Sequence, residues 1–136
     1  MGYRSDVLIA VVFMNAEHNT RAMVAWKVHC AAEGRTDPLV EHEEYVTFTT
    51  LENKKYPCIL FRANGWKWYD SYPEVQWWEH FRHYMCENQQ AHTILVRIGE
   101  DAADTVQDAL FPDDGPDFWI HDHFGVSRSI RCDTES

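Results

Sequence analysis

An unbroken apolar run from Val7 to Phe13 constrains the fold of this chain more than any other feature. A strand with one face in water alternates apolar and polar side chains, whereas this run contains no polar residue. It is rich in Val and Ile, which at this length favours a strand over a helix. We therefore expect a central strand that is buried on both faces of a sheet.

The elements that follow are predicted from periodicity and from cap and turn residues. Asn19 and Thr20 can cap a helix that ends at about Glu33, where Gly34 supplies a left-handed stop. The other predicted elements are a half-exposed strand over 44–51, a strand over 58–63, a helix from the Ser71-Tyr72-Pro73-Glu74 capping box to about Glu87, a strand over 92–98, a short acidic helix over 101–110 and one or two strands over 117–132 broken at Gly125.

This element order is β-α-β-β-α-β with a C-terminal β extension. It predicts an α+β fold of the ferredoxin-like kind, with a single mixed, mainly antiparallel sheet and both long helices on one face. The chain has 136 residues and contains neither an internal repeat nor a linker between two parts. We therefore expect residues 1–136 to form one domain.

The charge of the chain is acidic and unevenly distributed. The net charge is −10, and residues 101–136 hold nine acids against only Arg128 and Arg131. Sequence-independent binding of nucleic acids depends on Lys and Arg, so direct nucleic-acid binding is not expected. One explanation of the acidic surface is a basic protein partner, and the other is that the charge only keeps the protein soluble.

The cysteines and the apolar segments indicate an intracellular protein. The four cysteines show neither a C-x-x-C pair nor compact disulfide spacing, which favours buried free thiols in a reducing cytoplasm: Cys30, Cys58, Cys86 and Cys132. The apolar run that ends at Met14 is too short to span a membrane and lacks the flanks of a signal peptide. We therefore expect no membrane association.

Aromatic residues are concentrated in the centre of the chain. Four of the six tryptophans lie within fourteen residues: Trp66, Trp68, Trp77 and Trp78. Such a density marks either the centre of a core or an exposed anchor for another molecule. Trp77 and Trp78 lie about 100° apart on a helix, so we expect one of them to reach a sheet edge or solvent.

Two groups of histidines could bind a metal, and each also has a structural explanation. On a strand, His121 and His123 point the same way, as two ligands would, or they belong to a polar sheet face. His80, His83 and Cys86 follow one another at steps of three along a helix. Because the H-E-x-x-H arrangement is absent, this ladder also fits the polar shoulder of an amphipathic helix.

The remaining candidates for chemistry are weaker. Glu100, Asp101 and Asp104 could hold a divalent cation, or could favour a helix start through capping and the helix dipole. A Cys–His dyad could assemble in space from distant residues. Since no phosphate-binding loop, nucleophile elbow or dinucleotide fingerprint is present, we predict no cofactor and no catalytic residue.

Four motifs are spread in order over nearly the whole chain: Met1-Gly2-Tyr3-Arg4-Ser5-Asp6-Val7, Lys67-Trp68-Tyr69-Asp70-Ser71-Tyr72-Pro73-Glu74-Val75-Gln76, Arg97-Ile98-Gly99-Glu100-Asp101 and Val126-Ser127-Arg128-Ser129-Ile130. In these motifs the chain resembles a group of small, mostly uncharacterised bacteriophage proteins. The resemblance implies a shared fold and an accessory protein made in the cytoplasm of an infected bacterium. It brings no assigned catalytic residues. Small acidic accessory proteins of phages are often inhibitors of host enzymes or of defence systems, including anti-CRISPR proteins.

The leading hypothesis is a non-enzymatic protein that binds and inhibits a host protein with a basic surface. Aromatic anchors and acids would form its contact surface: Trp66, Trp68, Tyr69, Trp77, Asp113, Asp114 and Asp117. One alternative is a small enzyme or a ligand- or metal-binding protein that uses His121 and His123. Another is a self-associating module that has no host target.

Overall fold

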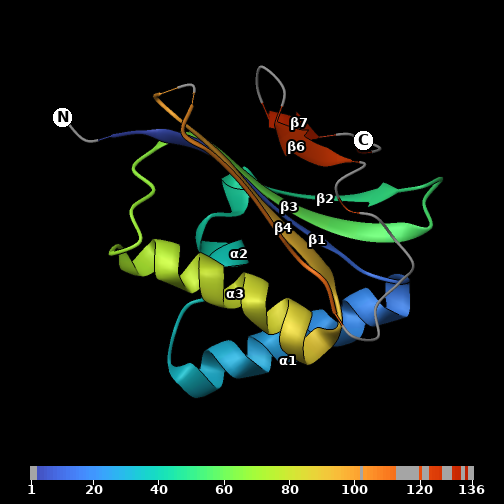
Figure 1. Ribbon diagram of the computed structural model, residues 1–136. Helices are drawn as coiled ribbons and strands as arrows, with labels where there is room; N and C mark the ends of the chain where they lie inside the picture. Colours follow the sequence, from blue (N-terminus) through green and yellow to red (C-terminus); the bar gives the residue numbers. More distant parts are fainter. Residues whose placement is uncertain are drawn as a thin grey trace.

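The computed structural model describes residues 3–101, 103–112, 120, 123–126, 130–132 and 134. In chain order its elements are β1 (Ser5–Val12), α1 (Ala16–Glu33), α2 (Pro38–Glu41), the 3-10 turn η1 (Glu43–Tyr45), β2 (Val46–Leu51), β3 (Tyr56–Trp66), α3 (Pro73–Gln89), β4 (His92–Gly99), β5 (Thr105–Leu110), β6 (Phe124–Val126) and β7 (Ile130–Cys132). Five strands form one sheet in the order β2-β3-β1-β4-β5, and β6 pairs with β7 in a second, smaller sheet (Figure 1).

The predicted central strand is confirmed. β1 lies between β3 and β4, and every residue from Val7 to Phe13 is buried. Alternate side chains point to opposite faces, so Ile9 packs into a core on one face while Leu8 packs into a second core on the other. An apolar residue is therefore needed at each position of the run.

The two faces of the sheet are covered by different parts of the chain (Figure 1). The helices α1 and α3 cover one face, where Trp26, Phe61 and Trp78 belong to the core. The small β6–β7 sheet covers the other face, where Phe124 and Ile130 pack against the main sheet. The C-terminal β extension thus lies across the sheet and does not continue it as a further strand.

The α+β class and the two long helices on one face are as predicted. Every pairing among the described strands is antiparallel, so this part of the chain contains no parallel pair of the kind found in a mixed sheet. Since β1 and β2 are both antiparallel to β3, they run in the same direction without touching.

The prediction of a short acidic helix over 101–110 is wrong. Thr105–Leu110 is strand β5, which pairs with β4 from Ile98 opposite Thr105 to Thr93 opposite Leu110. The pairing supplies backbone partners for the otherwise open edge of β4, and this tertiary gain outweighs local helix preference. Asp101 belongs to the preceding turn, where its carboxylate accepts a hydrogen bond from the amide of Ala103.

Helix boundaries differ from the predictions at their N-terminal ends. The cap of α1 is Asn15, whose side chain accepts from the His18 amide, and Thr20 lies inside the helix. Gly34 ends α1 at φ 66°, as predicted. Pro73 begins α3, but the cap position is Tyr72 and has no side-chain cap, so the expected capping box does not form.

Candidate functional site

The tryptophans of the central block pack into the helix-side core. Trp78 has no exposed surface and stacks on Phe61 with ring centroids 4.0 Å apart. Trp77 is only 6% exposed and packs on Trp26, while its indole N–H donates to the carbonyl of Thr36 at 2.8 Å. The expectation that one of Trp77 and Trp78 reaches an edge or solvent is therefore wrong. The physical reason is that α3 is covered on two sides, by the sheet and by α1 with the segment that follows it.

Burial changes what the predicted anchors can contribute to a contact surface. Trp68 is 7% exposed, and the half-buried Trp66 packs edge-on against Tyr45. Tyr69 is half-buried and its hydroxyl accepts from the amide of Tyr3. The predicted acidic residues Asp113, Asp114 and Asp117 lie outside the described residues.

Polar side chains from three distant segments meet at one end of the main sheet. The register brings them together, because Ser5 of β1 lies opposite Trp66 of β3 on one side and opposite Gly99 of β4 on the other. We name this group the tyrosine–carboxylate cluster, and its members are Tyr3, Arg4, Asp6, Tyr69, Arg97, Glu100, Asp101 and Asp104.

Tyr3 lies at the centre of the tyrosine–carboxylate cluster. Its hydroxyl donates to Asp104 Oδ2 at 2.9 Å and accepts from the amide of Asp101 at 3.0 Å. The Asp101 amide lowers the pKa of Tyr3, but desolvation and the Asp104 carboxylate outweigh it, and the net pKa is raised above its ordinary value. Tyr3 is therefore a neutral donor at physiological pH.

Arg97 and Asp104 form a bidentate ion pair within the cluster. Two guanidinium nitrogens of Arg97 donate to the two carboxylate oxygens of Asp104 at 2.9 and 3.0 Å, which is the bidentate geometry of strong charge-assisted pairs. These bonds, together with the Tyr3 hydroxyl, lower the pKa of Asp104. Asp104 therefore stays ionised and fixes the turn between β4 and β5.

The other members of the cluster hold backbone groups. Glu100 accepts from the amide of Arg4 at 2.8 Å, and the Arg4 guanidinium donates to the carbonyl of Gly65 at 2.8 Å. Asp6 accepts from the amide of Gly65 at 2.9 Å. The candidate cation ligands Glu100, Asp101 and Asp104 are thus already engaged with protein donors, which favours the structural explanation for them.

The tyrosine–carboxylate cluster coincides with three of the four motifs that the sequence analysis singled out. Its members come from residues 1–7, 67–76 and 97–101, with Asp104 just beyond. Sequence reasoning recognises each segment separately and misses that they meet. The missing information is the register of β1 against β3 and β4, which joins residues up to about one hundred positions apart.

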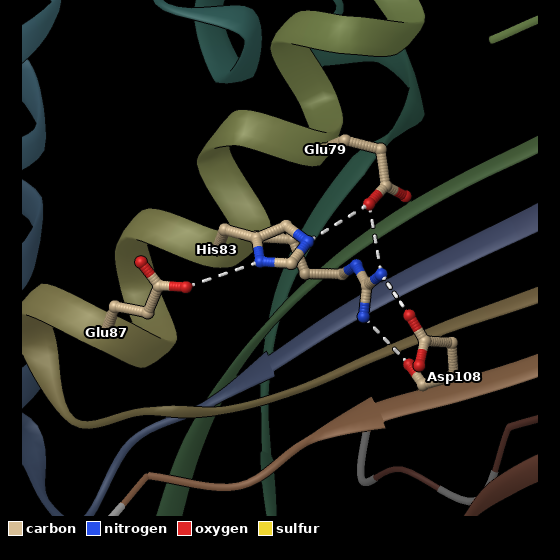
Figure 2. A network of polar contacts seen from close by, with 5 residues as sticks. Glu79, His83, Glu87 and Asp108 are labelled. Carbon is tan, nitrogen blue, oxygen red and sulfur yellow. Dashed lines mark hydrogen bonds and ion pairs between the residues drawn. The ribbon is translucent and has the colours of Figure 1, made fainter.

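The histidine ladder on α3 is a polar shoulder that includes a buried arginine. Figure 2 shows His83 between Glu79 and Glu87, with its ring nitrogens 3.7 and 3.6 Å from their carboxylates. The buried Arg82 donates to Glu79 at 3.0 Å and to the carboxylate of Asp108 at 2.6 Å. These contacts join α3 to β5.

The other members of the ladder turn away from His83. His80 Nε2 lies 2.7 Å from His29 Nε2 of α1, so one of the two rings donates a hydrogen bond to the other. Burial, with a smaller contribution from His29, lowers the pKa of His80. Cys86 is buried. The ladder therefore does not converge on one point, as a metal site requires.

Metal binding and thiol chemistry gain no support from the described residues. In that part of the chain, no group of three or more His, Cys, Asp or Glu side chains is placed to hold a metal. His123 pairs with Glu52 at 2.7 Å, and His121 lies outside the described residues. Burial raises the pKa of Cys30 to about 11 and raises that of Cys58 further, so both thiols stay protonated.

Two surface cavities lie along the helix layer. The larger, about 330 Å³, lies between the start of α1 and the end of α3, and it is lined by Met14, His18, Arg21, Asn88, Gln89 and Gln90. The smaller, about 150 Å³, lies beside Trp77 and is lined by Arg35, Pro38, Glu41, His42, Pro73 and Glu74. Neither contains a nucleophile paired with a base in the arrangement that covalent catalysis requires.

Comparison of the chain with protein-family models, with curated proteins and with solved structures gave no match. Among the described helices, none combines the length and the apolar composition needed to cross a bilayer.

Proposed function

We propose that the protein is a phage accessory protein that binds a host protein and inhibits it, as a host-takeover or anti-defence factor. The observation that supports this proposal is the tyrosine–carboxylate cluster, which presents an aromatic and acidic surface at one end of the sheet. Tyr3 is 36% exposed, and Asp6, Glu100 and Asp101 are exposed around it. Tyrosine and carboxylate side chains together suit a basic protein surface.

Preorganisation supports a binding role for this surface. The members of the tyrosine–carboxylate cluster already hold one another through hydrogen bonds, so binding would immobilise few additional rotamers. Association loses less free energy when the contacting side chains are fixed in advance. The tyrosines replace the buried tryptophans as the aromatic part of the surface.

Charge supports the choice of a basic partner. The net charge of −10 raises the local concentration of a positively charged protein around the chain and speeds encounter. In this proposal Asp113, Asp114 and Asp117 steer the partner, while Tyr69 and the carboxylates near it make the contact.

The test is a pull-down from nuclease-treated host lysate with a C-terminal tag, because the N-terminal segment carries Tyr3. The variant Glu100→Lys with Asp101→Lys reverses two exposed acids of the tyrosine–carboxylate cluster beside Tyr3. The control reverses two exposed acids of α1, Glu17 and Glu33, and changes the net charge equally. We expect the native chain and the control to recover one host protein in stoichiometric amount, and the variant to lose it.

Two outcomes would contradict the proposal: equal recovery by all three proteins, or recovery of no host protein by the native chain. Once the partner is identified, the variant Asp113→Lys with Asp114→Lys tests steering. We expect a lower association rate and a weaker salt dependence, with little change in the dissociation rate. An unchanged association rate at low salt would count against steering.

A further inference from the structure

Among the described residues, the β2 edge of the main sheet has no strand paired along it. β2 pairs with β3 on one side, and no other described strand lies on its second side. Its register against β3 is regular from Val46 opposite Phe61 to Leu51 opposite Tyr56, so no bulge interrupts it. Natural sheet edges are usually blunted by a charge, a proline or a bulge. The six residues of β2 supply none of these features.

The composition of β2 favours pairing with a further strand. Its sequence contains only β-branched and apolar residues: Val46, Thr47, Phe48, Thr49, Thr50 and Leu51. Phe48 lies at the centre of the strand and is 64% exposed, although Val46 on the same face packs against the helix-side core. A strand paired along β2 would cover this phenylalanine.

Charges of opposite sign flank the two ends of β2. Glu43 and Glu44 precede it in η1, whereas Glu52, Lys54 and Lys55 follow it in the turn to β3, and all five are exposed. The first end of β2 is therefore acidic and the second end carries a net positive charge. A two-fold axis that pairs two copies of β2 antiparallel places the start of each strand beside the end of the other. The glutamates of each copy then lie beside the lysines of its partner, and this contact occurs twice.

We propose that two copies of this chain associate through antiparallel pairing of β2, which joins their two five-stranded sheets into one. The axis passes at Thr49, which places Glu44 of each copy opposite Lys54 of the other. The two Phe48 rings are then diagonal neighbours on one face and pack together. The occupant is a second copy because its flanking charges are the complement that β2 requires. The tyrosine–carboxylate cluster lies away from β2, at the ends of β1 and β4, and stays accessible in the dimer.

The first test measures solution mass by sedimentation over a range of concentrations. We expect the native chain to reach twice its monomer mass, and the variant Phe48→Glu to stay monomeric at the same concentrations. Phe48 contributes little to the core, so the circular dichroism of this variant should remain native-like. A native chain that stays monomeric at every concentration overturns the proposal and leaves the edge to a strand of another protein.

A charge-exchange experiment tests the antiparallel arrangement. In variant A, Glu43 and Glu44 become lysine, and in variant B, Lys54 and Lys55 become glutamate. Each variant alone faces like charges at both contacts, so we expect its dimer dissociation constant to rise at least about tenfold. In an equimolar mixture each contact again joins opposite charges, and we expect a mixed A–B dimer.

Controls separate this effect from net charge. Glu17→Lys with Glu33→Lys changes the net charge as variant A does, and Arg21→Glu with Lys67→Glu changes it as variant B does, both away from β2. We expect both controls to dimerise like the native chain. If A and B dimerise as tightly as the native chain, or if their mixture stays monomeric, the proposed pairing is wrong.

Discussion

The two edges of the main sheet differ in the charged side chains placed along them. On the β5 edge, Arg82 extends from α3 and donates to the backbone carbonyl of Asp108 at 2.8 Å and to its carboxylate at 2.6 Å. The same edge is anchored at its turn by the Arg97–Asp104 pair. On the β2 edge, all six side chains of the strand are uncharged, and its centre is the exposed Phe48.

This difference indicates where the sheet can be extended. An edge strand recruits another strand through its free amides and carbonyls. A carbonyl that already accepts from Arg82 and lies beside the charges of Glu79 and Asp108 is a poor template. The uncharged β2 edge retains that capacity, since no described strand pairs along it. The two edges of the sheet therefore differ in their ability to accept a further strand.

The largest expected effect on stability comes from replacing Arg82, which bonds to the β5 edge. Arg82 is almost fully buried, and Arg82→Met keeps most of its apolar length while it removes the bonds to Glu79 and Asp108. The loss of these charge-assisted bonds lowers the free energy of unfolding. Both carboxylates are partly exposed and regain water, which limits the expected loss to about 2 to 3 kcal/mol. Urea denaturation measures this loss, and an opened β5 edge should also add association that Phe48→Glu does not abolish.

His83→Ala is the matched control for this prediction. His83 contacts Glu79 in the same network but is half exposed and forms longer contacts, so its loss should change stability by less than about 0.5 kcal/mol. Equal effects of the two substitutions would contradict the assignment of Arg82 as the residue that holds β5 to α3.

The next effect concerns the turn that anchors the β5 edge. A Cβ atom at Gly99 would lie 2.3 Å from the Tyr3 hydroxyl and 2.4 Å from Asp104 Oδ2, so Gly99→Ala must displace the centre of the tyrosine–carboxylate cluster. We expect a loss of about 2 kcal/mol, measured by thermal unfolding. Gly65→Ala is a useful comparison because Gly65 has open space but φ +69°, and strain alone should account for about 1 kcal/mol. A smaller loss at Gly99 than at Gly65 would show that the cluster yields easily.

The parts of the fold that can be predicted from sequence are those set by local pattern. The apolar run of β1, the Gly34 stop and the Pro73 start each follow from residues a few positions apart. The acids near β5 fit a helix start and so predict a helix there, whereas the real determinant of β5 is the edge of β4. The sequence pattern predicts that one of Trp77 and Trp78 is exposed, but both are buried. The pattern of a single helix does not show that α3 is covered on two sides.

The tyrosine–carboxylate cluster can be predicted only as separate segments. Tyr3 bonds to Asp104 across about one hundred residues, and that pairing depends on the register of β1 against β4. Arg82 carries a weaker signal that sequence reasoning could use. It lies four residues after Trp78 and one turn before Cys86 on the inner side of α3, and an arginine on an apolar stripe indicates a buried charge with a partner on another element.

A smaller effect on stability is expected from a change of pH, which acts on Asp104 in the turn between β4 and β5. The pKa of Asp104 is lowered in the folded chain from its ordinary 3.8, first by Arg97 and then by Tyr3. The unfolded chain therefore takes up this proton first as the pH falls. The stabilisation is complete above that ordinary value and is lost as the pH drops toward the folded pKa. We expect the stability difference between the native chain and Asp104→Asn to shrink as the pH falls below about 4, as measured by urea denaturation. A difference that is constant with pH would exclude this linkage.

The smallest effect on the stability of the monomer is expected at the β2 edge. Phe48 is 64% exposed, so Phe48→Thr removes little buried surface and places a residue of high strand propensity in β2. We expect the unfolding free energy of the monomer, measured at low concentration, to change by less than about 0.5 kcal/mol. The same substitution should weaken association at high concentration, because it removes the ring that packs near the two-fold axis. If it destabilises the monomer as much as Arg82→Met does, Phe48 is a core residue and the contrast between the two edges is lost.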